Sequence, residues 1–325
     1  MNVKQKNTVV TAGDSNYIWG LFLLVASMRA SGMDEPVIVG TKRFQPYHAA
    51  VLENLGGVRL VPLDKFDQSL TCAKAKMMLM AETEYVTWAD SDAFFTGNVS
   101  DIMPPPSPDR IHVRRRQPFE MLLAFPPPYD LKTILPTWRR DVCACAGVAE
   151  SDPSVPVADP PSFLSCSASF LSVARSQERF LRVWHELMMR LPGGDVGVVD
   201  RSLACYHQLD ESCLNACLEF LPDAPRVTET YAMDKDPAHF FAHCIGTPKP
   251  WVAWTPYTFR YFDAGCRIVE WAVREKLRLP GPVPYSLRAG HKLACRVLAR
   301  PLELRQKVRN RLKRLKGKWK EGGHG

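Results

Sequence analysis

The amino-acid sequence predicts an α/β fold in which helices cover both faces of a doubly wound, mostly parallel sheet. Short, almost continuously apolar segments alternate with segments of helical periodicity between Thr8 and Ala89, as in parallel sheets that are buried on both faces. Polar turns follow two of the apolar segments, where ligands bind in such sheets. With 325 residues, 46% hydrophobic and 23% charged, the chain can form one large domain with appendages or two small domains.

The N-terminal part of the chain supplies the clearest elements. β-Branched residues from Thr8 to Ala12 predict a buried strand, and the following turn at 13–16 offers side chains that can cap a helix. Glycines end the first two predicted helices. The predicted strands are 8–12, 36–40, 58–61 and 85–89, and the predicted helices are 17–29, 48–55 and 72–82.

Prolines change the character of the chain after Pro104. Proline triplets at 104–106 and 126–128, with a proline-rich stretch at 152–161, predict an irregular, loop-rich segment over 103–161. Regular patterns then return. The elements predicted beyond this segment are a strand within 162–173 and helices at 178–190 and 210–221.

The positive charge of the chain is local. The formal net charge is +8, but the segment from Arg288 to Lys320 alone carries 13 lysines and arginines and a single acid, Glu303. Outside that segment 29 basic residues stand against 33 acidic ones. The basic balance therefore describes one C-terminal segment and not the body of the protein.

Ten cysteines raise the question of disulfides or zinc. Their spacing, as in Cys143-Ala-Cys145, lacks the paired C-x-x-C hooks of a zinc site. No secretory signal pattern precedes the first strand, and the most apolar stretch, 17–25, is shorter than the about 20 residues of a membrane span. We expect buried free thiols in a protein that stays in the cytoplasm.

Asp90-Ser91-Asp92 closes the strand predicted at 85–89. Two carboxylates one residue apart, at a strand end where the chain turns, can both point at one hard divalent cation, which can neutralise a diphosphate. Most isolated D-x-D triplets are solvated acids in turns. A phosphatase with a nucleophilic aspartate is a further alternative, but such a triplet follows the first strand, whereas Asp90 follows a later one.

A second constellation lies late in the chain, in His243-Cys-Ile-Gly246-Thr-Pro-Lys249-Pro-Trp251. A histidine can complete a metal shell, a glycine lets the backbone approach a phosphate, and a lysine can neutralise one. For a histidine alone, a core side chain beside a proline turn is the simpler interpretation. The nine-residue spacing is more specific than any one of its members.

Together these motifs resemble glycosyltransferase family 8, which contains glycogenin and the bacterial lipopolysaccharide galactosyl- and glucosyltransferases. That family has a D-x-D followed by an apolar turn, here Asp90 to Phe95, and a late H-x-x-G-x-x-K-P-W, here His243 to Trp251. The resemblance covers about 8–275 with its motifs in the family's order. It implies a GT-A fold in which Asp90, Asp92 and His243 bind Mn²⁺ or Mg²⁺.

The resemblance also assigns residues that bind the nucleotide sugar. The segment Thr11 to Tyr17 is similar to the family's first nucleotide-binding loop, and Ala73-Lys74-Ala-Lys76 to a basic segment that reaches the diphosphate and sugar. A core position for Tyr17 and an exposed helix face for the two lysines are the alternatives. The residues expected to bind the nucleotide sugar are Ala12, Asp14, Asn16, Tyr17, Lys74, Ser91, Gly246 and Lys249.

On the sugar side the chain departs from the family. Asp210 and Glu211 stand where the family has an aspartate and a glutamine, and the resemblance implies that both face the donor sugar as catalytic residues. A helix cap for Asp210 and a solvated helix-start acid for Glu211 are the alternatives. Ser165-Cys166-Ser167-Ala168 lacks an asparagine and a glycine that are common in the family.

The resemblance implies transfer of a hexose from a UDP-sugar to an acceptor hydroxyl on a glycan, glycolipid or protein, with retention of configuration and Mn²⁺ dependence. The alternative is a relative that binds a nucleotide sugar without transferring it. We expect one GT-A domain over 1–275, in which 103–161 is a loop-rich insertion or acceptor region, and a basic, helical appendage over 276–325.

Beyond Pro301 the chain has the pattern of a cationic amphipathic helix. Apolar residues recur at intervals of three and four among basic ones, at Leu304, Val308, Leu312, Leu315 and Trp319. Such a helix suits an anionic membrane surface, which we expect 302–320 to bind peripherally. Nucleic-acid binding is disfavoured by the acidic body, and a solvated tail without a partner is the remaining alternative.

Overall fold

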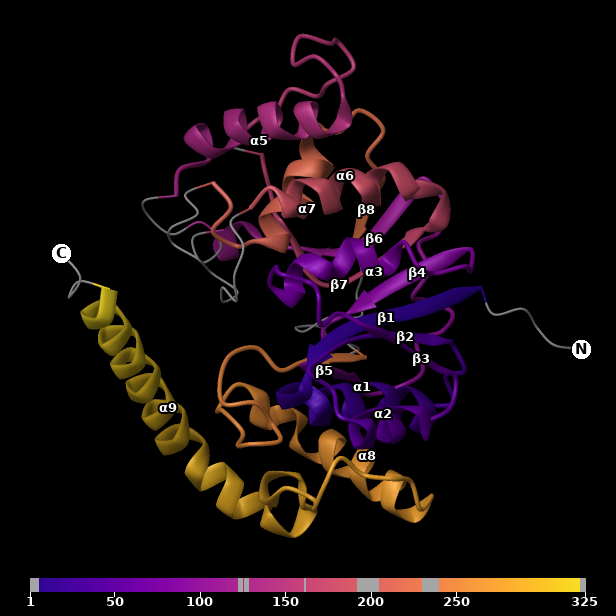
Figure 1. Ribbon diagram of the computed structural model, residues 1–325, viewed down its shortest axis with the longest axis vertical. Coiled ribbons are helices and arrows are strands. Elements are labelled where there is room, and N and C mark those ends of the chain that lie inside the picture. The colour runs from indigo at the N-terminus through magenta and orange to yellow at the C-terminus, as the bar shows by residue number, and fades with distance from the viewer. Residues whose placement is uncertain are drawn as a thin grey trace, which may run out of the picture.

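The structure is a computed structural model that describes residues 6–121, 125, 129–160, 162–191, 205–229 and 240–321. A central sheet divides it into two layers of helices (Figure 1). The seven strands are ordered β3-β2-β1-β4-β7-β6-β8, and β7 alone runs antiparallel to its neighbours. The strands are β1 (Asn7–Asp14), β2 (Val37–Lys42), β3 (Val58–Pro62), β4 (Tyr85–Ala89), β6 (Arg110–Arg115), β7 (Cys166–Ala174) and β8 (Arg226–Glu229).

Each face of the sheet has its own apolar core, because alternate side chains of a strand point to opposite faces. On β1, Val9 belongs to one core and Val10 to the other. The first core is closed by α1 (Ile18–Ala30), α2 (Pro46–Glu53) and α8 (Phe262–Arg274). The second is closed by α3 (Lys74–Met78), α5 (Leu131–Ala146), α6 (Glu178–Met189) and α7 (Asp210–Phe220). The doubly wound, mostly parallel α/β prediction is confirmed.

The prediction that 103–161 is irregular is wrong for two stretches. The chain forms β6 (Arg110–Arg115) within the sheet and the helix α5 (Leu131–Ala146), which contains Pro136. The helix was missed because the prolines of this segment argued against regular structure. Its buried face is nevertheless apolar and consists of Ile134, Leu135, Trp138, Val142 and Cys143. The strand β6 was missed because most of its residues are polar or charged. Its buried positions hold only Ile111 and Val113.

The other predicted elements are present with shifted ends. The helix predicted at 72–82 is shorter, because a 3₁₀ turn at Leu70–Ala73 precedes α3 and the helix stops at Met78. The strand predicted within 162–173 begins at Cys166. A two-stranded sheet lies apart from the main one, in which β5 (Ala93–Phe95) pairs antiparallel with β9 (Phe241–His243). The sequence did not indicate this small sheet.

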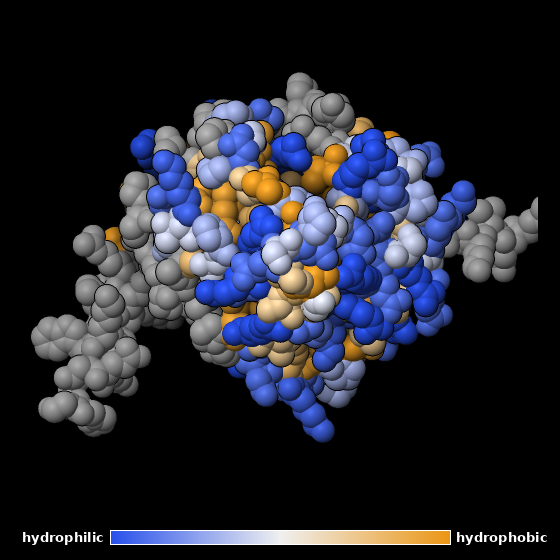
Figure 2. All heavy atoms as spheres, turned by 90° about the horizontal axis from the view of Figure 1, so that it is seen from above, coloured by the Kyte–Doolittle hydropathy of each residue, from blue (hydrophilic) through white to orange (hydrophobic). Residues whose placement is uncertain are grey.

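The C-terminal helix α9 (Lys292–Glu321) extends away from the body of the molecule (Figure 1). It begins well before Pro301, where the sequence predicted its start, and the proline lies inside it. Within the described residues, no helix combines the length and the hydropathy that crossing a membrane requires. The opposite end of the molecule, near α5 and α6, presents a mainly hydrophilic surface with small apolar patches (Figure 2).

Candidate functional site

The carboxyl end of β4 delivers Asp90 to the edge of the sheet, as the sequence predicts. The Asp90 backbone N–H donates to the Ser169 carbonyl of β7 at 2.9 Å. The chain then turns and enters β5, whose Ala93 pairs with His243 of β9. A further backbone bond from the Cys244 N–H to the Asp92 carbonyl, 2.8 Å long, closes this junction. Backbone pairing therefore brings His243 to the D-x-D turn from a distant part of the chain.

Asp90, Asp92 and His243, here the Asp–His cluster, each offer one ligand atom, and these atoms lie within 4.8 Å of one another. The His243 Nε2 atom is 3.3 Å from an Asp92 oxygen and 3.7 Å from an Asp90 oxygen. Two carboxylates and one imidazole form a donor set that suits Mn²⁺ and related divalent cations. These residues fit a metal ion in both geometry and chemistry.

Positive charges balance the carboxylates of this cluster. Burial alone would raise the pKa of Asp92, but His243 and Lys249 hold it well below its usual range. Burial would likewise lower the pKa of His243, and the Asp92 carboxylate raises it instead. Lys249 pairs with Asp92 and donates to the Cys244 carbonyl at 3.0 Å. The imidazole of His243 and the ammonium of Lys249 thus lie against the carboxylate of Asp92, which a cation would use.

Lys74 links the Asp–His cluster to the start of α7. Its ammonium lies 2.8 Å from Asp90 and 2.7 Å from Asp210, and it donates to the Ala168 carbonyl at 2.8 Å. The side chain is only 4% exposed. Since an ammonium has three donors, protein groups use all of them. The structure thus favours Lys74 as a brace between two carboxylates over direct contact with a diphosphate.

Asp210 is a buried carboxyl group with a raised pKa beside this brace. Burial raises its pKa to about 6, although Lys74 opposes the rise and Asp90 adds to it. The Trp184 indole donates to the Asp210 carbonyl at 3.0 Å, which fixes the first turn of α7. Asp210 is therefore the first residue of the helix and also a buried acid at the site.

The loop after β1 lies against the late motif. Asp14 accepts from the Asn16 backbone N–H at 2.9 Å and from its side-chain amide at 3.1 Å, which closes a tight polar turn. The Tyr17 ring meets the Trp251 ring edge-on, with centroids 5.6 Å apart. Burial raises the pKa of Tyr17, while Lys249 lowers it. Tyr17 is thus close to the lysine of the late motif.

Gly20 is a site residue that sequence reasoning missed. A Cβ built on this α1 position would lie 2.1 Å from the Ser91 carbonyl oxygen and 2.6 Å from the Trp251 ring. The absence of a side chain lets the D-x-D turn and the late motif pack directly on α1. A glycine inside an otherwise apolar helix was the available signal. Gly246 is different, because it has φ +83° and a Cβ built on it would meet nothing within 4 Å.

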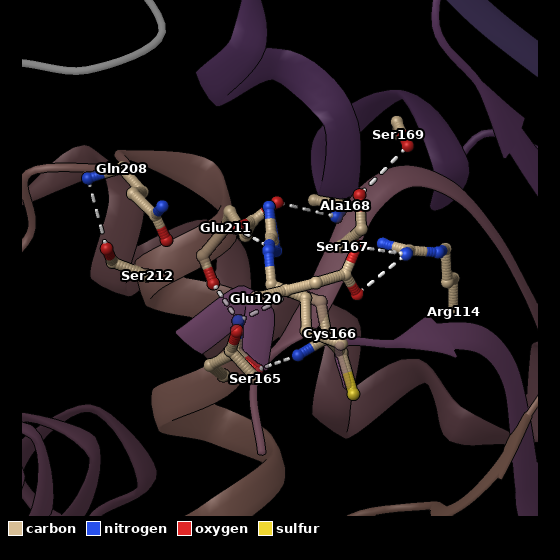
Figure 3. Close-up of polar contacts among 12 residues, drawn as sticks. Arg114, Glu120, Ser165, Cys166, Ser167, Ala168, Ser169, Gln208, Glu211 and Ser212 are labelled. Atoms are coloured by element: carbon tan, nitrogen blue, oxygen red, sulfur yellow. Dashed lines mark hydrogen bonds and ion pairs between the residues drawn. The ribbon is translucent and has the colours of Figure 1, made fainter. Parts of the chain in front are cut away.

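Beside β7 lies a second group of residues, here the α7–β7 cluster. It consists of Cys166, Ser167, Ala168 and Glu211 (Figure 3), together with Asn215 of α7. The Asn215 side chain accepts from the Cys166 N–H at 2.5 Å and donates to its carbonyl at 2.8 Å. The Ala168 N–H faces Glu211 at 3.4 Å. Asn215 thus ties α7 to the strand segment that departs from the family's pattern.

Arg116, directly after β6, also contacts the α7–β7 cluster. Its Nη1 atom lies 2.7 Å from Glu211 Oε1. No feature of the sequence distinguishes it from Arg114 and Arg115. Lys76 contrasts with it, since its side chain is exposed and its ammonium lies 5.5 Å from the centroid of the Phe66 ring. No contact of the described structure joins Lys76 to the Asp–His cluster.

Similar folds occur among solved glycosyltransferases, whereas no protein-family profile and no curated protein matches the sequence. The bifunctional glycosyltransferase WbbM aligns over 88% of this chain with a TM-score of 0.55 and 12% identity, and the aligned part is 51% of WbbM. The galactosyltransferase LgtC, solved with donor and acceptor sugar analogues, aligns over 86% of this chain and 98% of its own, with a TM-score of 0.51 and 14% identity.

A third match is the glycosyltransferase GlyE of Streptococcus pneumoniae TIGR4, with a TM-score of 0.50 and 13% identity over 86% of this chain and 66% of its own. The chain therefore spans about half the length of WbbM and two thirds of GlyE. At these identities the likeness shows a shared fold. The chain has a GT-A-like glycosyltransferase fold, as the sequence predicted.

Proposed function

We propose that this protein is a metal-dependent glycosyltransferase that moves a hexose from a UDP-sugar to an acceptor hydroxyl, with retention of configuration. The observation that carries the proposal is the convergence of Asp90, Asp92 and His243 within 4.8 Å at the end of β4. In a sheet of this kind that edge is the ligand-binding edge. The sequence motifs and the glycosyltransferase fold both support the same site.

The Asp–His cluster would hold Mn²⁺ or Mg²⁺. When bound, the ion supplies positive charge that stabilises a departing diphosphate. The protein's own part is to aim the three ligands, which the β5–β9 pairing does for His243 and the Lys74 brace does for Asp90. Lys249, next to Asp92, carries an ammonium that would neutralise a phosphate oxygen bound at this site.

The loop after β1 would hold the nucleoside. Ala12 ends the apolar part of β1, and the Asp14–Asn16 turn presents carboxylate and amide groups that can bond a ribose or a base. Tyr17 offers a ring beside Trp251 for contact with the base. Ser91 and Gly246 contribute backbone near the phosphates, where Gly246 adds no side chain.

Asp210 and Glu211 would face the donor sugar and orient its hydroxyl groups. Both begin α7, and Asp210 is joined through Lys74 to Asp90. The sugar would thus lie between the Asp–His cluster and the α7–β7 cluster. LgtC was solved with donor and acceptor sugar analogues; we infer the same two ligand classes here, with a glycan, glycolipid or protein as acceptor.

Calorimetry tests this proposal directly. Purified protein is titrated with UDP, UDP-glucose, UDP-galactose and a set of other nucleotides, each in Mn²⁺, in Mg²⁺ and in EDTA. We expect a uridine nucleotide to bind with a cation and to lose affinity in EDTA. Equal binding in EDTA would remove the metal role. Preference for a different base would overturn the donor assignment.

Binding without transfer is the second candidate function, and the α7–β7 cluster is the observation that favours it. Where the family often has an asparagine and a glycine, this chain has Cys166 and Ala168, both nearly buried. Release of UDP from a UDP-sugar, measured with excess acceptor and in water, separates the two candidates. A protein that binds UDP-sugar and releases no UDP under any of these conditions is a binding protein.

We further propose that α9 attaches the enzyme to an anionic membrane surface. The helix exposes Leu304 and Val308, which are 56% and 58% exposed, and its sequence beyond Pro301 is strongly basic. Basic residues near an anionic leaflet contribute about 1 kcal/mol each. In the structure the exposed apolar face also continues toward the start of the helix, through Leu293 and Val297.

A further inference from the structure

Arg116 stands at the end of a run of three arginines, and its neighbours have other partners. Arg114 donates to both carboxylate oxygens of Glu120 at 2.7 Å, so it forms an ion pair with a residue close to it in the sequence. Arg116 is anchored by its backbone N–H, which donates to the Ser165 carbonyl at 2.8 Å. Its guanidinium is then directed to α7, where Nη1 lies 2.7 Å from Glu211 Oε1.

The Arg116–Glu211 pair is only partly open to solvent. The two side chains are 19% and 13% exposed. Within the described part of the chain, neither Arg116 Nη1 nor Glu211 Oε1 has a hydrogen-bond partner, so the contact between them is an ion pair without an aligned N–H···O bond. Buried polar atoms normally have such a partner. The part of each side chain that stays exposed leaves room for a third group to reach the pair.

We propose that Arg116 is a positioning residue for the donor sugar, and that it forms with Glu211 a receptor for one sugar hydroxyl. The hydroxyl donates to the Glu211 carboxylate and accepts from the Arg116 guanidinium, because a hydroxyl can do both at once. Both bonds are charge-assisted and hence stronger than neutral ones. This inference rests on the proposed function and adds to it a residue that selects the sugar.

The chemistry of position 211 explains why an arginine is needed. A glutamine, which the resembling family has there, carries a donor and an acceptor on one side chain. An ionised glutamate only accepts. Arg116 supplies the missing donor, and its ion pair holds the Glu211 carboxylate in place. It follows that Arg116 matters only while residue 211 is a glutamate.

The test compares Arg116→Gln, Arg116→Lys, Glu211→Gln and the double variant Arg116→Gln/Glu211→Gln in the full-length protein. Arg110→Gln, at the far end of β6, is the matched loss of one positive charge. The measured quantity is the ratio of the Kd of UDP to the Kd of UDP-glucose or UDP-galactose in Mn²⁺. The Kd of UDP alone depends on the contacts with the metal and the nucleotide. The ratio of the two Kd values isolates the contribution of the sugar to binding. Thermal unfolding confirms that each variant is folded.

We expect Arg116→Gln to lower this ratio of Kd values about tenfold, because the variant loses one charge-assisted hydrogen bond to the sugar. The Kd of UDP should stay unchanged. Arg116→Lys should recover part of the loss. The double variant should recover most of it, because a glutamine at position 211 makes the arginine dispensable. Arg110→Gln should behave as wild type.

Four outcomes overturn the inference while the proposed function stands. One is a ratio that Arg116→Gln leaves unchanged, and another is an equal loss for UDP and UDP-sugar. The third is a double variant no better than Arg116→Gln. A wild-type ratio of one for both hexoses contradicts the receptor as well. If the wild type binds no uridine nucleotide with Mn²⁺ or Mg²⁺, the proposed function fails and the inference with it.

Discussion

The Asp–His cluster and the α7–β7 cluster lie at the same edge of the sheet but are held together by different means. Backbone pairing of β5 with β9 and close packing on Gly20 fix the first. Side-chain bonds from Asn215 and the Arg116–Glu211 ion pair fix the second. A site built on backbone contacts tolerates few alternatives, whereas side-chain contacts can be exchanged. This difference matches where the chain keeps the family's motifs and where it departs from them.

The largest effect is expected at Asp92. Asp92→Ala removes a ligand of the proposed cation and leaves His243 and Lys249 without their shared carboxylate. We expect the affinity for UDP in Mn²⁺ to fall more than about a hundredfold, since changes even in outer-shell partners of a metal cost about 10- to 100-fold. Calorimetry measures it, with the exposed Asp101→Ala as the control. Unchanged Mn²⁺-dependent binding would refute the metal site.

Gly20→Ala tests whether packing on α1 supports the same cluster. The added methyl group meets the Ser91 carbonyl, a backbone atom that cannot turn aside, so the D-x-D turn must shift. Overpacking of this kind costs about 1–3 kcal/mol of stability, and we expect about a tenfold loss in affinity for UDP with Mn²⁺. The outcome that counts against this account is wild-type affinity. Gly281→Ala, where nothing lies within 4 Å of the new Cβ, serves as the control.

The Asp–His cluster was predictable from the sequence because its residues follow local rules. A D-x-D triplet at the end of an apolar strand and a nine-residue late motif are both continuous in the chain. Arg116 was not predictable, since only the position of β6 beside β7 gives it Glu211 as a partner. The strand β6 itself was missed, because two buried residues among four polar ones are a weak pattern.

Lys74 shows a different limit of sequence reasoning. A basic residue near the predicted site was expected to bind phosphate, and its position at the site was foreseen. Its role depends on two carboxylates and a carbonyl that arrive from β4, α7 and β7. A sequence motif states which residue types are present, but the competing partners of a charge are set by the fold.

Asn215→Ala should affect the α7–β7 cluster and spare the Asp–His cluster. The asparagine is 2% exposed and makes three hydrogen bonds, to both backbone groups of Cys166 and to the Glu211 carbonyl. Its loss leaves buried backbone groups unpaired, at a cost of about 2–3 kcal/mol in the free energy of unfolding. We expect the advantage of UDP-sugar over UDP to fall about fivefold. If EDTA sensitivity changes as well, the two clusters are not independent.

The smallest effect on either cluster is expected from α9, which extends away from both (Figure 1). Leu304→Ser/Val308→Ser replaces two exposed apolar side chains in the full chain. Each buried leucine or valine contributes about 1.5–3 kcal/mol. Flotation with vesicles that contain anionic lipid should therefore fall by at least tenfold, while the Kd values of UDP and UDP-sugar stay within about twofold. Val157→Ser, an exposed apolar residue outside α9, is the control for lost surface hydrophobicity. Equal flotation of the variant and the wild type would leave α9 without a membrane role, and an altered nucleotide affinity would mean that the helix takes part in the site.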